Sequence, residues 1–178
     1  MKLDNILING PKEAKNILLF AHGAGASMDS VFMNSIVKGL NKNGIITIRF
    51  EFPYMAKRRI GKNTFPDKII DLCVFYKNLY FQVKKKYPNK NIWLGGKSMG
   101  GRVSTIVSRS IDVNGVVAFG YPFHPINKID KLRLESLQLS GPPILIIQGT
   151  RDKFGSIYEV KQYKIHKNNT IFWIEDGD

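Results

Sequence analysis

The chain alternates short, nearly continuous apolar runs with longer helical stretches along almost its whole length. The apolar runs lie at residues 17–20, 45–50, 92–95, 116–119, 144–148 and 170–174. A strand that is apolar at successive positions is typical of a parallel sheet covered on both faces, whereas a strand with one wet face alternates apolar and polar residues. The repeated order of strand, helix and strand therefore predicts an α/β fold, a three-layer α/β/α sandwich around a mostly parallel sheet.

Helix signals separate these runs. Asp29 has the chemistry of an N-cap for a helix to Leu40, and Asp67 that of an N-cap for a longer helix to about Tyr87. Further helices are expected at residues 98–110 and 156–164, with a short one at 131–139. The stretch at 53–66, rich in Pro, Arg and Lys, predicts a loop.

Length and composition predict one globular domain that spans residues 1–178. Hydrophobic residues make up 43% of the chain and charged residues 23%, which excludes a disordered chain. The one cysteine, Cys73, excludes an internal disulfide and a multi-cysteine zinc site. No apolar run approaches the ~20 residues of a membrane span, and residues 1–20 predict two strands rather than a signal peptide. We therefore expect a soluble, cytoplasmic protein with no membrane partner.

The net charge of +13 raises the question of nucleic-acid binding. The basic residues are dispersed, however, and the tight clusters are limited to residues 57–59 and 84–86. The second cluster lies at the end of an expected helix, where cations suit the helix dipole. Abundant Lys, Ile and Asn also indicate the codon bias of an AT-rich genome. We predict no nucleic-acid partner, and attraction of an acidic substrate stays open.

The string GKSMGG at residues 96–101 is the strongest chemical signal. It fits the pattern G-x-S-x-G and lies between an expected strand and an expected helix, which is the context of a nucleophile elbow. There Ser98 would project its hydroxyl above the sheet, beside a helix N-terminus that favours negative charge. A merely structural Gly-rich turn is one alternative. A phosphate-binding loop is another, but Asn91 stands where the Walker spacing needs a glycine.

The string HGAGA at residues 22–26 follows the first core strand. Such a loop can direct a backbone N–H at a substrate oxygen, so the amides of Ala24 and Met99 are the candidate oxyanion donors. The alternative is a tight turn in which the His22 side chain is packed and hydrogen-bonded, which is the interpretation that we favour for this ring.

Asp152, in the string QGTRD at residues 148–152, is the candidate catalytic acid because it follows a strand and comes after Ser98 in the chain. An ordinary turn or capping aspartate is the alternative. The matching base should follow the last strand, and no histidine stands there. His166 precedes that strand, His22 belongs to the oxyanion loop, and His124 follows a strand and is a fallback base.

Several strings together resemble one family. They are AHGAGASMDSVFM at 21–33, RFEFPYMAKRR at 49–59, GGKSMGGR at 95–102, GYPFHP at 120–125 and QGTRDKFG at 148–155. In order and spacing they are similar to small bacterial α/β-hydrolases of the KANL/Tex30 type, often labelled dienelactone-hydrolase-like. The resemblance covers nearly the whole chain. It implies a minimal α/β-hydrolase fold without a lid domain, and a serine hydrolase site with Ser98 as nucleophile and Asp152 as acid.

The resemblance also implies a histidine directly after residue 178. In this family the last strand runs into a Glu-Asp-Gly-Asp-His string, of which residues 175–178 match the first four positions. We therefore expect the chain to be truncated at its C-terminal end, one residue before its base and before the family's closing helix. Dienelactone hydrolases proper use a cysteine nucleophile. Here the nucleophile position is Ser98, and Cys73 lies in an expected helix, so their substrate is not carried over.

The expected activity is cleavage of a carboxylic ester, thioester or related acyl bond through a Ser-Asp-His triad. The alternative is a non-catalytic protein-interaction module, since relatives with this fold include subunits of chromatin-modifying assemblies. The loop at 53–66 suggests an apolar and basic rim and an anionic acyl substrate. Candidate rim residues are His22, Tyr54 and His124. We expect no metal and no cofactor, and a monomer or homodimer.

Overall fold

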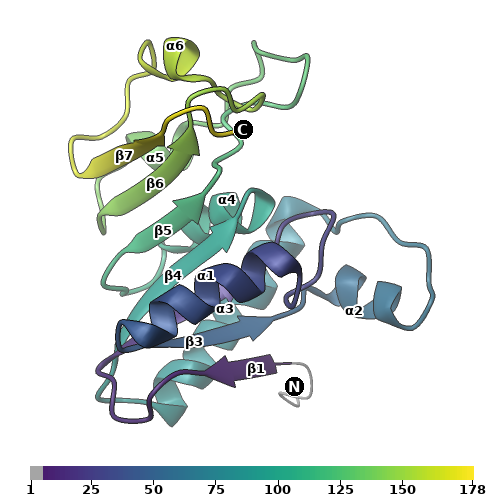
Figure 1. Ribbon diagram of the computed structural model, residues 1–178, viewed down its shortest axis with the longest axis vertical. Helices are drawn as coiled ribbons and strands as arrows, with labels where there is room; N and C mark the ends of the chain where they lie inside the picture. Colours follow the sequence, from purple (N-terminus) through teal and green to yellow (C-terminus); the bar gives the residue numbers. More distant parts are fainter. Residues whose placement is uncertain (1–5) are drawn as a thin grey trace.

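The computed structural model describes residues 6–178, which form a seven-stranded sheet with helices on both faces (Figure 1). The strands are β1 (Ile6–Asn9), β2 (Asn16–Ala21), β3 (Ile45–Phe50), β4 (Asn91–Lys97), β5 (Val116–Phe119), β6 (Ile144–Gly149) and β7 (Asn169–Ile174). The helices are α1 (Val31–Lys42), α2 (Pro53–Arg59), α3 (Ile69–Lys86), α4 (Met99–Val107), α5 (Glu135–Gln138) and α6 (Ile157–Val160). β1 pairs antiparallel with β3, and all other neighbouring strands are parallel. The predicted mostly parallel α/β/α fold is confirmed.

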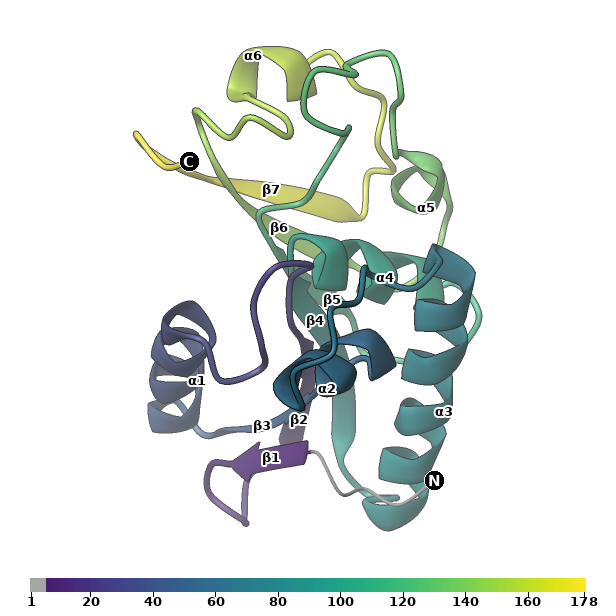
Figure 2. The ribbon, with the colours of Figure 1, turned by 90° about the vertical axis from the view of Figure 1, so that its right-hand side faces the viewer.

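The central strand β2 faces two separate cores. Ile17 and Leu19 pack into the larger core on the side of α3 and α4. Leu18 and Phe20 belong to a second cluster that includes Met33 of α1. Figure 2 shows α1 on one side of the sheet and α3 and α4 on the other. Because successive side chains of a strand point to opposite faces, a strand between two helix layers is apolar at each position.

The strand order places the site. In the sheet order β1-β3-β2-β4-β5-β6-β7, the chain moves outward from β2 to β3 and then returns to β4 on the other side of β2. The carboxyl ends of parallel strands on either side of such a reversal border a crevice, where α/β proteins bind ligands. The loops that follow β2, β4, β6 and β7 all leave from this edge of the sheet.

The helix boundaries differ from the sequence predictions at two proposed caps. α1 begins after Ser30, because the Asp29 carboxylate is instead bound by the Arg59 side chain. α3 begins after Lys68, because the Asp67 carboxylate accepts a hydrogen bond from the Tyr54 N–H. Both predicted N-caps are therefore wrong, and each carboxylate forms a tertiary contact.

The expected loop at 53–66 contains the helix α2, with Pro53 in its first turn. A proline is favoured there because its missing N–H has no partner in a helix at that position. The expected helix at 156–164 is reduced to the single turn α6, which starts at a Ser156–Glu159 capping box. The expected helix at 131–139 is likewise a single turn, α5.

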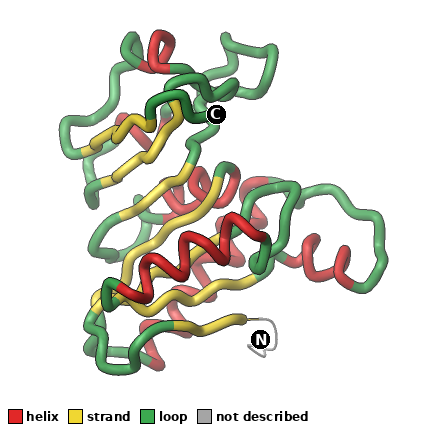
Figure 3. Tube along the Cα trace, in the orientation of Figure 1, coloured by secondary structure: helices red, strands yellow, loops and turns green. Residues whose placement is uncertain are grey.

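The chain between β5 and β6, where many hydrolases carry a helical lid, consists of loop apart from the single turn of α5 (Figure 3). The expectation of a fold without a lid domain is confirmed. In the described part of the chain, residues 6–178, no helix combines the length and the apolar character that a bilayer-spanning segment needs.

Tyr76 of α3 ties the helix layer to the centre of the sheet. The ring is fully buried, and its hydroxyl donates to the carbonyl oxygen of Leu19 at 2.5 Å. The same hydroxyl oxygen accepts a hydrogen bond from the Gly95 N–H at 3.3 Å. One phenol thus bridges β2 and β4, the two strands that carry the elements of the candidate site.

Replacement of Tyr76 by Phe should lower the free energy of unfolding by about 1–3 kcal/mol, because it leaves buried backbone groups without this partner. Urea unfolding followed by circular dichroism measures the difference. Tyr158→Phe is the matched control, since Tyr158 is 81% exposed, and it should leave stability unchanged. Equal stability of Tyr76→Phe and the wild type would contradict the bridging role.

Candidate active site

Ser98 occupies a strained turn between β4 and α4. Its backbone has φ 49° and ψ −113°, a region that residues other than glycine rarely adopt. Two hydrogen bonds hold it there: the Ser98 N–H donates to the Phe119 carbonyl at 2.9 Å, and its own carbonyl accepts from the Arg102 N–H at 3.0 Å. This is the backbone geometry that the predicted nucleophile elbow requires.

Two glycines allow the first turn of α4 to lie directly on the sheet. A Cβ on Gly96 would stand 2.4 Å from the carbonyl carbon of Gly100. A Cβ on Gly100 would stand 2.6 Å from the carbonyl oxygens of Ala21 and His22. Since neither position has room for a side chain, the G-x-S-x-G pattern is a packing requirement that brings Ser98 next to the loop after β2.

Ser98 opens into a cavity of about 600 Å³ at the carboxyl edge of the sheet. The lining residues are Phe32, Lys97, Ser98, Phe119, Gly120, Ile126, Ile147, Gly149, Asp152, Lys153, Phe154, Ile174, Gly177 and Asp178. They come from the carboxyl ends of β4, β5, β6 and β7, from the loops that follow these strands, and from the start of α1. The predicted nucleophile and the predicted acid therefore share one cavity.

The Asp152 carboxyl group is buried, with 8% of the residue exposed. Burial raises the pKa of this carboxyl above its usual value, and the nearby Asp178 adds to the rise. A hydrogen bond from the Phe154 N–H, 2.8 Å from Oδ1, acts in the opposite direction and fixes the orientation of the group. A buried, oriented carboxylate at this edge can hold an imidazole and stabilise its protonated form.

The amides of Ala24 and Met99 remain available to a ligand. Within residues 6–178, neither N–H donates a hydrogen bond to another group of the protein. Met99 is the first residue of α4, so its N–H also lies at the positive end of the helix dipole. The structure thus leaves both predicted oxyanion donors free, one directly after Ser98 in the chain and one in the loop after β2.

The carbonyl groups of the loop after β2 are held by α2. The Tyr54 hydroxyl lies 3.3 Å from the Gly23 carbonyl oxygen and 3.1 Å from that of Ala24. The Arg58 guanidinium also donates to the Ala24 carbonyl, at 3.4 Å, and stacks on the Tyr54 ring. Because α2 engages the carbonyl oxygens, this part of the loop is held without using the N–H of Ala24.

His22 braces the same loop from within. The ring is fully buried; Nδ1 lies 2.6 Å from the Gly23 carbonyl oxygen, and Nε2 accepts a hydrogen bond from the Phe52 N–H at 3.1 Å. Since a carbonyl oxygen only accepts, Nδ1 carries a proton. Since Nε2 accepts a hydrogen bond, it carries none, and the ring is neutral. Burial is the main cause that lowers the pKa of His22 below 6.5.

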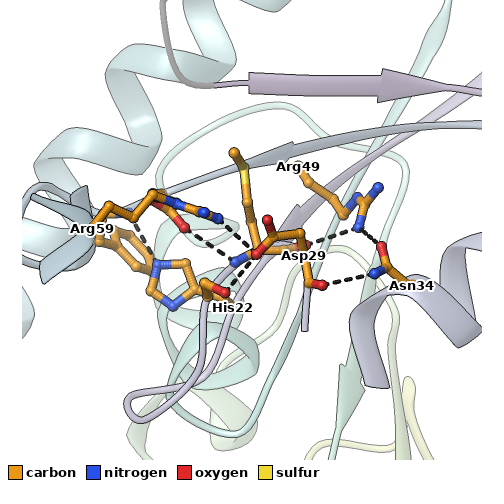
Figure 4. A network of polar contacts seen from close by, with 9 residues as sticks. His22, Asp29, Asn34, Arg49 and Arg59 are labelled. Atoms are coloured by element: carbon orange, nitrogen blue, oxygen red, sulfur yellow. Dashed lines mark hydrogen bonds and ion pairs between the residues drawn. The ribbon is translucent and has the colours of Figure 1, made fainter. Parts of the chain in front are cut away.

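A network of charges joins this loop to α2 and β3 (Figure 4). Arg59 contacts the buried Glu51 carboxylate and the Asp29 carboxylate, each at 2.7 Å. The hydrogen bond from Arg59 is the main cause that lowers the pKa of Asp29 to about 2. Arg49 donates to the Asn34 side chain at 2.6 Å, at the start of α1. The strings at 21–33 and 49–59 therefore bind each other and fix the oxyanion loop.

The three predicted rim residues are buried, so their assignment to a substrate rim is wrong. His22 and Tyr54 bind the backbone of the oxyanion loop, as described above. His124 is 2% exposed, and its Nε2 lies 3.5 Å from the Glu159 carboxylate. The helix α2 and the loop after it likewise contribute no residue to the lining of the described cavity.

No histidine of residues 6–178 lines the cavity. His22 is committed to the contacts above, and His166 precedes β7, at the opposite edge of the sheet. His124 Nε2 makes no hydrogen bond within residues 6–178, and the ring is near enough to Asp152 for its charge to lower the pKa of that carboxyl. The fallback assignment of His124 as base therefore stays a prediction, although the ring does not line the cavity. Cys73 of α3 is half-buried, and burial raises the pKa of its thiol to about 11, so it is a poor nucleophile.

A comparison with protein-family models shows to which family the chain belongs. A family model described as an alpha/beta hydrolase domain matches residues 14–178. The chain belongs to this family.

Several solved structures share the fold of this hydrolase domain. An alpha-beta serine hydrolase homologue from Coxiella burnetii has a TM-score of 0.77 and 22% identity, over 96% of this chain and 80% of that one. A serine hydrolase without a lid from Xanthomonas campestris has a TM-score of 0.76 and 17% identity, over 96% and 78%. A dienelactone hydrolase from Anabaena variabilis has a TM-score of 0.71 and 19% identity, over 96% and 79%. At these identities the likeness concerns the fold.

Sequence reasoning missed Lys97 and the aromatic wall of the hydrolase cavity, Phe32, Phe119 and Phe154. The position of Lys97 beside Ser98 was a usable signal, because the residue before an elbow serine ends the strand at the same edge of the sheet. The aromatic residues could not be recognised from the sequence as cavity residues, because apolar residues beside strands and helices are usually part of the hydrophobic core.

The neutral state of His22 predicts a loss of stability in mild acid. The unfolded ring binds a proton near pH 6.5, while the folded ring has a lower pKa, so the unfolded state holds more protons below that pH. The contribution of neutral His22 to the free energy of unfolding is complete above pH 6.5. This contribution falls as the pH drops towards the pKa of the folded ring. Its slope approaches 1.4 kcal/mol per pH unit, which corresponds to the uptake of about one proton on unfolding.

Urea unfolding at several pH values from 7.5 to about 5 measures this slope. His22→Gln, which keeps a donor and an acceptor, should be less stable at pH 7.5 and have a flatter profile. His166→Gln is the matched control and should keep the wild-type slope. A wild-type profile that His22→Gln leaves unchanged would disprove the assignment.

Proposed function

We propose that the protein hydrolyses a carboxylic ester, thioester or related acyl bond through a Ser-Asp-His triad. The observation that carries this proposal is the strained Ser98 at the start of α4, facing the same cavity as the buried Asp152. The backbone amides of Ala24 and Met99 are free within residues 6–178, and Met99 directly follows that serine. A nucleophile, an acid and two donors for a developing oxyanion are the parts that acyl transfer needs.

In the proposed reaction, Ser98 Oγ forms a bond to the substrate carbonyl carbon and passes its proton to an imidazole. The amides of Ala24 and Met99 bind the oxyanion of the tetrahedral intermediate. When the intermediate collapses, the bond to the leaving oxygen or sulfur breaks, and the imidazole returns the proton to that atom. Water then adds to the acyl-serine by the same route and releases the acid. Asp152 orients the imidazole and stabilises its positive charge.

We place the imidazole on a histidine directly after Asp178, the position that the resemblance to the KANL/Tex30 type implies. The support from the fold is that Gly177 and Asp178 already line the cavity with Ser98 and Asp152. The Asp152 carboxyl group is also close enough to Asp178 for the two charges to interact. A residue that follows Asp178 would therefore enter the cavity beside the acid that has to orient it.

The test is ester hydrolysis by the natural gene product, with 4-nitrophenyl acetate and butyrate as substrates. Ser98→Ala should lower kcat/KM by about 10³-fold or more, and Asp152→Asn by about 10³–10⁴-fold, because both act in one unit. Ser140→Ala and Asp130→Asn are matched controls at exposed positions and should keep full activity.

Hydrolysis that survives in folded Ser98→Ala would contradict the proposal. So would a folded natural gene product that hydrolyses neither ester, a result that would favour the non-catalytic interaction module.

A further inference from the structure

Lys97 ends β4 and directly precedes Ser98. Its side chain extends along the cavity, and the ammonium lies 4.5 Å from the centre of the Phe32 ring. The face of an aromatic ring attracts a cation and holds it in place. Phe32 in turn packs edge-to-face on Phe119, with ring centres 6.1 Å apart, so the ammonium rests on an apolar wall of the cavity.

The Lys97 ammonium has no acidic partner in the described residues 6–178: no carboxylate there lies within 4.0 Å of it. The other charged residues of the cavity, Asp152, Lys153 and Asp178, follow β6 and β7. With β5 between β4 and β6, the strands that carry the two groups are about 10 Å apart or more. Lys153 directly follows Asp152 in the chain and likewise has no carboxylate within 4.0 Å among residues 6–178. Lys97 differs because it directly precedes the nucleophile and its ammonium rests on the Phe32 ring.

The two arginines of the segment 53–66, from which the sequence suggested an anionic substrate, are engaged elsewhere. Arg59 binds two carboxylates, and Arg58 donates to the carbonyl oxygens of Thr64 and Ala24. Since none of this segment lines the cavity, attraction of an anion to the site rests on Lys97 rather than on this loop.

We infer that Lys97 is the anion-binding residue of this site. The substrate would then be an ester or thioester that carries a carboxylate or phosphate on an apolar group about the size of an aromatic ring, called the arm below. The arm would lie against Phe32 and Phe119, and its anion would form a charge-assisted hydrogen bond with the Lys97 ammonium. This inference rests on the proposed function for the acyl bond, while the anion preference itself can be measured without turnover.

The first experiment measures binding in the Ser98→Ala background of the natural gene product. Calorimetry compares 4-acetoxybenzoate with 4-acetoxybenzamide, which has nearly the same shape and no charge. The carboxylate should bind about tenfold more tightly, the size of one hydrogen bond to a charged group. Lys97→Met and Lys97→Gln should abolish the preference, and Lys97→Arg should retain it. Lys38→Met, an exposed lysine of α1, is the matched control and should also retain it.

4-Acetoxyphenyl phosphate in the same titration distinguishes the two sources of the anion. If the phosphate compound binds more tightly than 4-acetoxybenzoate, the natural substrate carries a phosphate. If it binds more weakly, the natural substrate carries a carboxylate. Equal affinity of all three compounds would overturn the inference, as would an anion preference that survives in both folded Lys97→Met and Lys97→Gln.

The second experiment compares kcat/KM for the same pair of esters in the protein with Ser98 intact. The anionic ester should be favoured about tenfold, and Lys97→Met should bring the ratio to about one. A protein without any turnover that still binds the anion through Lys97 would defeat the proposed function and leave the anion site standing. Turnover of both esters without a preference for the anionic one would support the proposed function and overturn the anion site.

Discussion

The close contact between α4 and the sheet is the constraint on which the rest of the site depends. Gly96 and Gly100 have no room for a side chain, so the helix starts directly above β4 and presses against the chain that leaves β2. Ser98 has its strained backbone conformation at this contact, and the start of α4 lies against the carbonyl oxygens of Ala21 and His22, where the loop of Ala24 begins. Strain of this kind persists only where the surrounding structure determines it completely, and it is concentrated at functional sites.

The loop after β2 has no secondary structure of its own, and its conformation is set from outside by polar contacts. His22 fixes it to the start of α2, Tyr54 binds its carbonyl oxygens, and the Arg59 ion pairs join it to β3. Buried polar groups of this kind are costly unless each has a partner, and here the contacts supply those partners while leaving two amides free. The result is a fixed loop with a free amide at Ala24, and the proposed function uses that amide with the one of Met99 as donors to a developing oxyanion.

The strands, the strained turn at Ser98 and the position of Asp152 at the same edge of the sheet could be predicted because each rests on a local pattern: apolar runs, G-x-S-x-G, and an aspartate after a strand. The caps at Asp29 and Asp67, the helix α2 and the burial of Tyr54 could not, because long-range contacts decide them. The sequence pattern makes Asp29 a cap for α1, but its carboxylate is bound by Arg59, which lies thirty positions away in the chain. Whether a basic residue such as Arg58 faces a cavity or a carbonyl is likewise settled only by packing.

The central claim is that Ser98 is an activated nucleophile, and one measurement tests it most directly. An intact-mass spectrum of the natural gene product is taken before and after exposure to a fluorophosphonate probe. The account predicts a single adduct, formed with loss of fluoride, that maps to Ser98 and is absent in Ser98→Ala. A folded protein that gains no adduct, or that gains the same adduct in Ser98→Ala, would contradict it.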